Sequence, residues 1–360
     1  MKKLEGKLKE SLLRLEAGLV SNLKLVWIYE MEDFMKKIQL NNTNLQTSQI
    51  CLGTSNYGTS FPEMKALRQL DKFCEMGGNF IDSAHVYGDW IPGETGRSEK
   101  IIGKWLNETG FRNKVIIATK GGHPNLESMN IHRVHPSYLE EDLEGSLENL
   151  KTNYIDIYFL HRDDLSIHVA TIIDYLEEKV RQGKIRYYGC SNWSLSRIIE
   201  AQNYAEENLY KGFVCNQIMG CLEDVNREYL MSRQMVALDK EFKRYHNETK
   251  MNLMSYMTIS GGYFSKRIDG KRLSQDMIDM YDNSSNDKIL EELRNMCRDG
   301  KYNINDFCFK YVTKQKFPSI AIASFSNDEQ LEQGMKCCEL EIDSELINSI
   351  SKYKKLQGKI

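Results

Sequence analysis

Short runs of apolar residues alternate with amphipathic stretches along most of the chain. The run over residues 154–161 is apolar almost throughout, which is typical of a parallel strand buried on both faces. Over residues 62–76, apolar side chains such as Met64, Leu67 and Leu70 recur at the spacing of one helix face, and two glycines end the pattern. The same alternation continues to the end of the chain and predicts repeated strand–helix units.

The pattern predicts eight strands, each followed by at least one helix. The expected strands cover residues 49–52, 79–82, 114–120, 154–161, 185–190, 212–216, 251–256 and 319–324. The expected helices cover residues 62–76, 97–109, 135–149, 169–182, 195–207, 226–246, 287–298, 304–315, 328–338 and 344–355. Eight units with no linker between them predict one (β/α)₈ TIM barrel, with long loops at 121–135 and 261–286 over its C-terminal face. A doubly wound open sheet is the alternative, but it usually has fewer strands, and no G-x-G-x-x-G follows the first strand.

Composition narrows the class of protein. The chain has 360 residues, 41% of them hydrophobic, and a formal net charge of −3, so a large core is expected and no nucleic-acid partner. It has no run of 18 uncharged apolar residues, so no membrane span is expected.

The nine cysteines form no C-x-x-C pair, which favours reduced thiols in a cytoplasmic protein. We interpret His132 and His135 as loop residues and predict no metal site. Nothing in the pattern fixes an oligomeric state.

The first 34 residues differ from the rest because they are charged and amphipathic and have no signal-peptide cleavage site. A second possible start, Met35, lies just before the first strand-like segment. We therefore expect the folded domain to cover residues 35–360. Residues 1–34 are either the product of a misassigned start or an additional helix.

Four ionisable residues stand at or just beyond the ends of consecutive apolar runs: Asp82, Tyr87, Lys120 and His161. In a barrel, the ends of neighbouring strands meet at one mouth, so we expect these side chains to converge. A tyrosine beside an ammonium group suggests proton donation to a carbonyl oxygen, with Lys120 lowering the pKa of Tyr87. Asp82 would hold Lys120, and His161 would orient the carbonyl. Each residue alone is more commonly structural, as a loop, rim or turn residue.

Other strand ends carry groups suited to a nicotinamide cofactor, which this chemistry requires as the hydride source. Ser191, Asn192 and Gln217 offer hydroxyl and carboxamide groups, and Tyr256 offers an aromatic ring for stacking. Asn192 is also a candidate helix cap beside Ser194.

These blocks resemble the aldo-keto reductase family. The matching segments, in order, are Leu52-Gly53-Thr54, the block from Phe80 to Gly88, Thr119-Lys120, Leu160-His161, Gly189 to Asn192, and Asn216-Gln217. The resemblance covers residues 37–353. It implies a (β/α)₈ barrel and an NAD(P)H-dependent carbonyl reductase with Tyr87 as the general acid, supported by Lys120, Asp82 and His161. The nicotinamide contacts would be Ser191, Asn192 and Gln217, with Tyr256 stacking.

The segments that would hold the rest of the cofactor depart from the family pattern. Where the family often has Tyr-Ser-Pro-Leu, this chain has Tyr256-Met257-Thr258-Ile259. After the last strand, Ser326 and Gln330 occupy the positions at which members that prefer NADP usually carry basic or polar groups. Gly53 and Thr54 are further expected cofactor contacts. The cations expected to supplement them in the long loop are Lys266, Arg267, Lys271 and Arg272. NADPH is expected ahead of NADH.

The substrate is expected to be a small carbonyl compound. Tyr57, His85, Trp90 and Asp163 would line the barrel mouth, and such a mixture of groups favours a sugar, cyclitol or keto-glycoside. The same aromatic residues are equally suited to loop packing. Two other functions remain open at this stage, namely a redox-sensing subunit that binds nucleotide without turnover and a barrel lyase that forms a Schiff base on Lys120.

Overall fold

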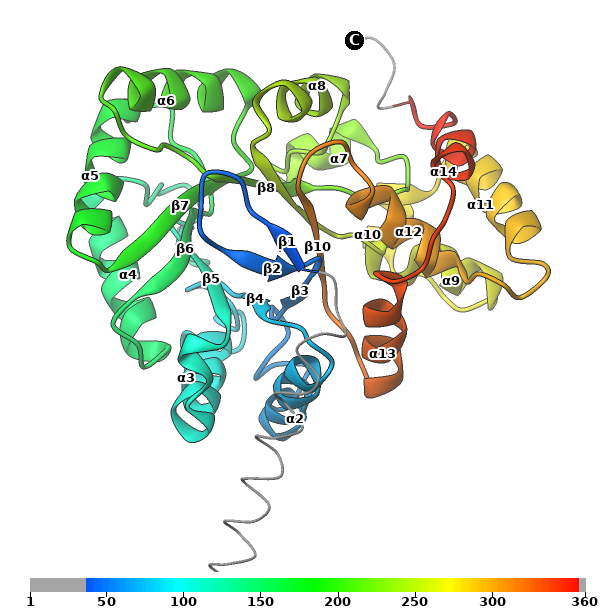
Figure 1. The fold of residues 1–360 in the computed structure, drawn as a ribbon, viewed down its shortest axis with the longest axis horizontal. Coiled ribbons are helices and arrows are strands. Elements are labelled where there is room, and N and C mark those ends of the chain that lie inside the picture. The colour runs from blue at the N-terminus through cyan, green and yellow to red at the C-terminus, as the bar shows by residue number, and fades with distance from the viewer. Residues whose placement is uncertain (1–36, 356–360) are drawn as a thin grey trace, which may run out of the picture.

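The computed structural model describes residues 37–355, and these form a closed barrel of parallel strands surrounded by helices (Figure 1). Around the barrel the strands follow the order β10-β3-β4-β5-β6-β7-β8-β9. Their bounds are β3 (Ile50–Gly53), β4 (Phe80–Asp82), β5 (Ile116–Gly121), β6 (Ile155–Leu160), β7 (Ile185–Ser191), β8 (Cys215–Met219), β9 (Asn252–Tyr256) and β10 (Ser319–Ala323). The predicted (β/α)₈ barrel is confirmed. The expected segment 1–34 lies outside the described residues.

The helices surround the barrel, and their apolar faces pack on the strands or on neighbouring helices. They are α2 (Glu63–Glu75), α3 (Arg97–Thr109), α4 (Pro136–Asn149), α5 (Val169–Arg181), α6 (Leu195–Glu207), α7 (Arg227–Ser232), α8 (Lys240–Thr249), α9 (Tyr263–Ile268), α10 (Gln275–Tyr281), α11 (Ser284–Met296), α12 (Ile304–Thr313), α13 (Asp328–Cys337) and α14 (Ser344–Ser351). Short 3₁₀ turns lie at η1 (Phe111–Asn113) and η2 (Ser260–Gly262). None of these described helices is both long and apolar enough to cross a bilayer.

A two-stranded hairpin that we did not predict covers the N-terminal end of the barrel (Figure 1). It consists of antiparallel β1 (Lys37–Gln39) and β2 (Gln46–Ser48). Leu40 and Leu45 in its loop are buried against strand residues such as Phe80. The hairpin therefore fills the closed end of the barrel and leaves the opposite end for the site.

The prediction of one long helix over residues 226–246 was wrong. The structure divides this segment into α7 and α8. Asp239 caps the second helix, since its Oδ1 accepts hydrogen bonds from the backbone N–H groups of Glu241 and Phe242. The connection between them bonds to the barrel, where Val236 N–H donates to Asn192 Oδ1 at 3.1 Å. Tertiary bonding to the barrel thus replaces the continuous helix that the hydrophobic period predicted.

The two loops expected over the barrel mouth differ from each other. The segment between β5 and α4 is irregular, as predicted, whereas residues 261–286 contain α9 and α10. All nine cysteines have free thiols.

Candidate active site

Lys120 joins three of the four expected catalytic groups. Its Nζ donates to Asp82 Oδ2 at 2.7 Å, to the Ser83 carbonyl at 2.6 Å and to Tyr87 Oη at 3.2 Å. The groups meet because β4 and β5 are paired in parallel, with Asp82 opposite Ala118. Lys120 and Asp82 are almost fully buried, while Tyr87 is only half-buried and lines the cavity described below.

The ammonium form of Lys120 is stabilised by its neighbours. Burial by itself would lower the pKa of Lys120, but Asp82 and Tyr87 outweigh it and the pKa is raised. Gln217 Nε2 donates to the other carboxylate oxygen of Asp82 at 2.8 Å and fixes its orientation. A Schiff base requires a neutral, accessible amine. The buried ion pair therefore argues against the lyase alternative.

The pKa of Tyr87 departs from our expectation. Burial raises it, and Lys120 opposes that rise without reversing it. The phenol therefore stays protonated at neutral pH. Lys120 lies beside both the hydroxyl and the ring face, with Nζ 4.7 Å from the ring centroid, a position from which an ammonium group stabilises negative charge on the phenol oxygen.

His161 stands next to Tyr87, with ring centroids 6.0 Å apart. Burial, with Lys120 and His123, holds the pKa of His161 well below its usual range, so the ring is neutral at pH 7. Its Nδ1 is buried and has no hydrogen-bond partner among the described residues. His161 also lines the cavity described below, so its neutral ring can meet a molecule bound there.

A cavity of about 950 Å³ opens beside Tyr87 and His161 and extends over β9 and β10. The expected cofactor residues at the strand ends line it, namely Gly53, Thr54, Ser191, Asn192, Gln217, Tyr256, Ser326 and Gln330. These residues come from the ends of β3, β7, β8 and β9 and from the segment after β10, and they share one cavity, as parallel barrel strands require.

The side chain of Asn192 makes its hydrogen bonds at the barrel mouth and does not cap a helix. Its Oδ1 accepts hydrogen bonds from Tyr256 Oη at 2.6 Å and from Val236 N–H, and its Nδ2 donates to Ser191 Oγ at 3.1 Å. Ser194 caps α6 instead, because its hydroxyl accepts from Arg197 N–H. The alternative of Asn192 as a helix cap was wrong.

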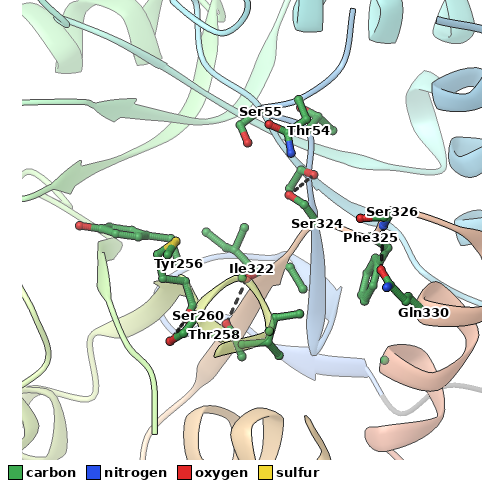
Figure 2. Close-up of a pocket in the computed structure, with 18 of the residues that line it drawn as sticks. Thr54, Ser55, Tyr256, Thr258, Ser260, Ile322, Ser324, Phe325, Ser326 and Gln330 are labelled. Atoms are coloured by element: carbon green, nitrogen blue, oxygen red, sulfur yellow. Dashed lines mark hydrogen bonds between the residues drawn. The ribbon is translucent and has the colours of Figure 1, made fainter. Parts of the chain in front are cut away.

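Figure 2 shows the other part of the cavity, where Tyr256 lies on one side and Ser326 and Gln330 lie on the other. Gln330 Oε1 accepts a hydrogen bond from Ser326 N–H at 2.9 Å and so orders the loop after β10. A Cβ at Gly53 would lie 3.0 Å from both Ile322 and Ser324, so glycine permits the close approach of β3 and β10 there. Thr258 Oγ1 donates to the Ile322 carbonyl and ties the loop after β9 to β10.

Two of the four expected loop cations reach this part of the cavity. Lys266 and Lys271 line it. Arg267 instead pairs with Asp287 at 2.8 Å, and Arg272 lines a separate surface hollow. Lys65 from α2 also lines the cavity, which sequence reasoning missed because an exposed helical lysine carries no distinguishing signal.

The four expected substrate residues do not all face the cavity. Tyr57 lines the cavity, but it is buried and its hydroxyl donates to Gln69. Trp90 is 46% exposed and packs edgewise on Tyr87, with centroids 6.4 Å apart. His85 faces Glu99 at 3.4 Å. Asp163 faces Arg197 at 3.4 Å, so neither of these last two points into the cavity.

Three residues in or beside the cavity were missed by sequence reasoning. Arg162 and Met235 line the cavity, and the His123 ring lies 4.8 Å from that of His161. Arg162 directly follows His161, so its position at a strand end was a usable signal. Met235 lies in the break between α7 and α8, which the expected continuous helix concealed.

Comparison with known proteins identifies the family. A model of the aldo/keto reductase family matches residues 49–355. The chain belongs to the aldo/keto reductase family. Membership supports an oxidoreductase that reduces carbonyl compounds.

Three proteins similar to this chain share about a quarter of their aligned residues with it. The chain is 26% identical over 333 residues to the uncharacterized oxidoreductase YrpG of Bacillus subtilis (strain 168), covering 88% of this chain and 95% of that protein. It is 25% identical to aryl-alcohol dehydrogenase GME11368 of Pestalotiopsis microspora, covering 86% and 80%. The holo form of aldo-keto reductase AKR11C1 from Bacillus halodurans superposes with a TM-score of 0.68 at 24% identity, covering 89% and 97%, which supports the fold.

Proposed function

We propose that this protein reduces an aldehyde or ketone to an alcohol at the expense of NAD(P)H, with Tyr87 as the proton donor. The observation that carries the proposal is the hydrogen-bonded series from Asp82 through Lys120 to Tyr87, which ends at a cavity beside the neutral His161. In this proposal the hydroxyl of Tyr87 and a nitrogen of His161 hold the carbonyl oxygen. As negative charge grows on that oxygen, Tyr87 gives it a proton, and Lys120 stabilises the phenolate form of Tyr87 that results.

The residues that line the cavity fit a nicotinamide dinucleotide. Ser191, Asn192 and Gln217 present hydroxyl and carboxamide groups at the end near Tyr87, and Tyr256 presents a ring beside them. At the other end, the lining includes Ser265 and Lys266, whose hydroxyl and ammonium groups suit phosphate oxygens. When bound, the reduced nicotinamide supplies the hydride that no side chain provides.

We propose NADPH ahead of NADH. Lys65, Lys266 and Lys271 bring three cations to the cavity, although Lys271 also pairs with Asp269 at 2.8 Å. Ammonium groups favour the additional phosphate of NADPH. Arg267 and Arg272 are not assigned to this phosphate, because Arg267 pairs with Asp287 and Arg272 lines a separate hollow.

The substrate is proposed to be a small carbonyl compound. The expectation of a sugar or cyclitol rested partly on His85 and Asp163, and both side chains are engaged outside the cavity. Without these two groups, the cavity lining gives less reason to expect a sugar or cyclitol than to expect carbonyl reduction.

The direct test is a screen in which the absorbance of NADPH and NADH is followed with a panel of aldoses, ketoses, inososes, keto-glycosides and aromatic aldehydes. We expect consumption of the reduced dinucleotide with a subset of the panel and formation of one alcohol per dinucleotide oxidised. Dinucleotide binding with no oxidation across the panel would contradict the proposal and favour the redox-sensing subunit.

A further inference from the structure

A single arginine at the catalytic end of the cavity has no carboxylate partner among the described residues. Arg162 lines the cavity, and its Nη1 donates to the Gln234 carbonyl at 3.1 Å. Its Nε is buried and makes no hydrogen bond within the part of the chain that the structure describes. A guanidinium has five N–H donors, so three N–H groups on the two Nη atoms are left for a ligand.

The charges around Arg162 do not neutralise it. The Lys120 ammonium is balanced by Asp82 at 2.7 Å. Burial lowers the pKa of both His123 and His161, so both rings are neutral at pH 7. Asp163, the next residue along the chain, is directed to Arg197. The substrate end of the cavity consequently carries one net positive charge.

The position of Arg162 is fixed from both sides. Its own carbonyl accepts a hydrogen bond from Trp193 Nε1 at 3.1 Å, which anchors the backbone at the end of β6. Its guanidinium is held by the connection between α7 and α8, in which Gln234 has a φ of +51°. Val236 N–H and the Val236 carbonyl bond to Asn192 and Met219, so this connection is part of the barrel mouth. A well-positioned cation at this place is a feature of the fold rather than of a mobile side chain.

Burial of an unpaired guanidinium costs free energy, and burial lowers the pKa of Arg162. A bidentate carboxylate recovers this cost through two charge-assisted hydrogen bonds. The phosphates of the dinucleotide are a poorer match, because the loops that suit them lie beyond Tyr256, toward Ser326 (Figure 2).

We propose that Arg162 binds a carboxylate of the substrate, so that the preferred substrates are carbonyl compounds that carry a carboxylate near the reacting group. This inference rests on the proposed carbonyl reduction. It assigns Arg162 to substrate selection and leaves proton donation with Tyr87.

A binding experiment tests the assignment without turnover. Benzoate and benzamide are titrated into the protein saturated with NADP⁺, and binding is measured by calorimetry. We expect benzoate to bind at least about tenfold more tightly than benzamide, and Arg162→Met to remove that difference while the affinity for NADP⁺ changes less than about twofold. Arg233→Met is the matched control, because that guanidinium pairs with Asp276 on the surface, and it should preserve the difference.

A kinetic experiment separates this inference from the proposed function. The substrates are 4-formylbenzoate and 4-methylbenzaldehyde, each with wild type, Arg162→Met and Arg162→Lys. We expect Arg162→Met to raise KM for 4-formylbenzoate by about tenfold or more and to leave KM for 4-methylbenzaldehyde nearly unchanged, with Arg162→Lys intermediate.

The outcomes are distinguishable. Equal binding of benzoate and benzamide, or an equal loss for both aldehydes in Arg162→Met, would overturn the role of Arg162, and turnover of the neutral aldehyde would still support the reductase. The opposite outcome is also distinguishable. If Arg162→Met abolishes selective benzoate binding but no carbonyl compound supports NADPH oxidation, the anion site stands and the proposed reaction is overturned.

Discussion

At the residue scale, the candidate site depends on a buried cation that is held by one carboxylate. Lys120 donates to Asp82, Ser83 and Tyr87 at once, so it orders the Tyr87 hydroxyl and offsets the charge of Asp82. This arrangement explains why an ionisable group ends each of two neighbouring apolar strands.

Lys120→Met tests the role of the ammonium. We expect kcat to fall roughly 100-fold or more, because the phenolate loses its stabilising charge. The variant should also lose about 3–5 kcal/mol of stability, since Asp82 is left buried without its ion-pair partner. Steady-state kinetics and urea unfolding measure the two effects. Retained kcat in a folded variant would show that Lys120 is structural only.

The residues that sequence reasoning found are those at strand ends, where position alone implies convergence. It could not tell that His85 turns to Glu99 or that Asp163 turns to Arg197, because the direction of a loop side chain depends on partners far along the chain. Arg162 stood beside His161 and was overlooked, since an arginine at a rim is usually solvated.

At the element scale, the break between α7 and α8 shapes the barrel mouth. Asp239 ends the connection by capping α8, and Val236 and Gln234 bond to Asn192 and Arg162 on the way. A continuous helix would remove these contacts and take Met235 out of the cavity.

Asp239→Ala tests this account of the break. The variant should lose about 1 kcal/mol of stability, because two N–H groups at the start of α8 lose their acceptor. Asp239→Asn retains an acceptor oxygen, so it should lose only a few tenths of the roughly 1 kcal/mol of stability that Asp239→Ala loses. Urea unfolding of the three proteins gives the comparison, and equal stability of Asp239→Ala and wild type would contradict it.

The long loop after β9 bears on cofactor choice. Changing Lys266 and Lys271 together to alanine should weaken NADPH binding about fivefold, or roughly 1 kcal/mol, and leave NADH binding nearly unchanged. Arg272→Ala is the control because it lines a different hollow. Fluorescence titration with both dinucleotides measures the change, and an equal effect on both would place the extra phosphate elsewhere.

At the scale of the whole molecule, the barrel was predictable because its signal is repeated eight times and does not depend on any one boundary. The N-terminal hairpin was not, since β1 and β2 are each three residues long and carry no clear period. The hairpin closes the N-terminal end of the barrel, where Leu40 and Leu45 pack on the strands.

Acid should weaken the fold partly through a histidine far from the catalytic groups. His246 is buried, its Nδ1 donates to the Met251 carbonyl, and its Nε2 accepts from Asn216. Burial lowers its pKa to about 4. Because the unfolded chain binds this proton near pH 6.5 and the folded chain does not, stability falls as the pH drops from about 6.5 to 4.

This contribution is worth about 3 kcal/mol over that range. His246→Asn keeps a polar side chain but cannot take up a proton, so its free energy of unfolding should change less with pH than that of wild type. Urea unfolding at several pH values gives the difference between the two proteins. Parallel pH dependence would show that His246 does not titrate between the two states.

The central claim is that Tyr87 donates the proton in a reaction driven by a reduced nicotinamide. The most direct measurement compares kcat/KM for a carbonyl substrate and the dissociation constant of NADPH in wild type, Tyr87→Phe and Tyr158→Phe. Tyr158 is the control because its buried hydroxyl has no hydrogen-bond partner among the described residues. We predict a roughly 100- to 10,000-fold loss of kcat/KM in Tyr87→Phe alone, with the NADPH dissociation constant unchanged within about twofold in all three. Undiminished turnover in Tyr87→Phe would contradict the account.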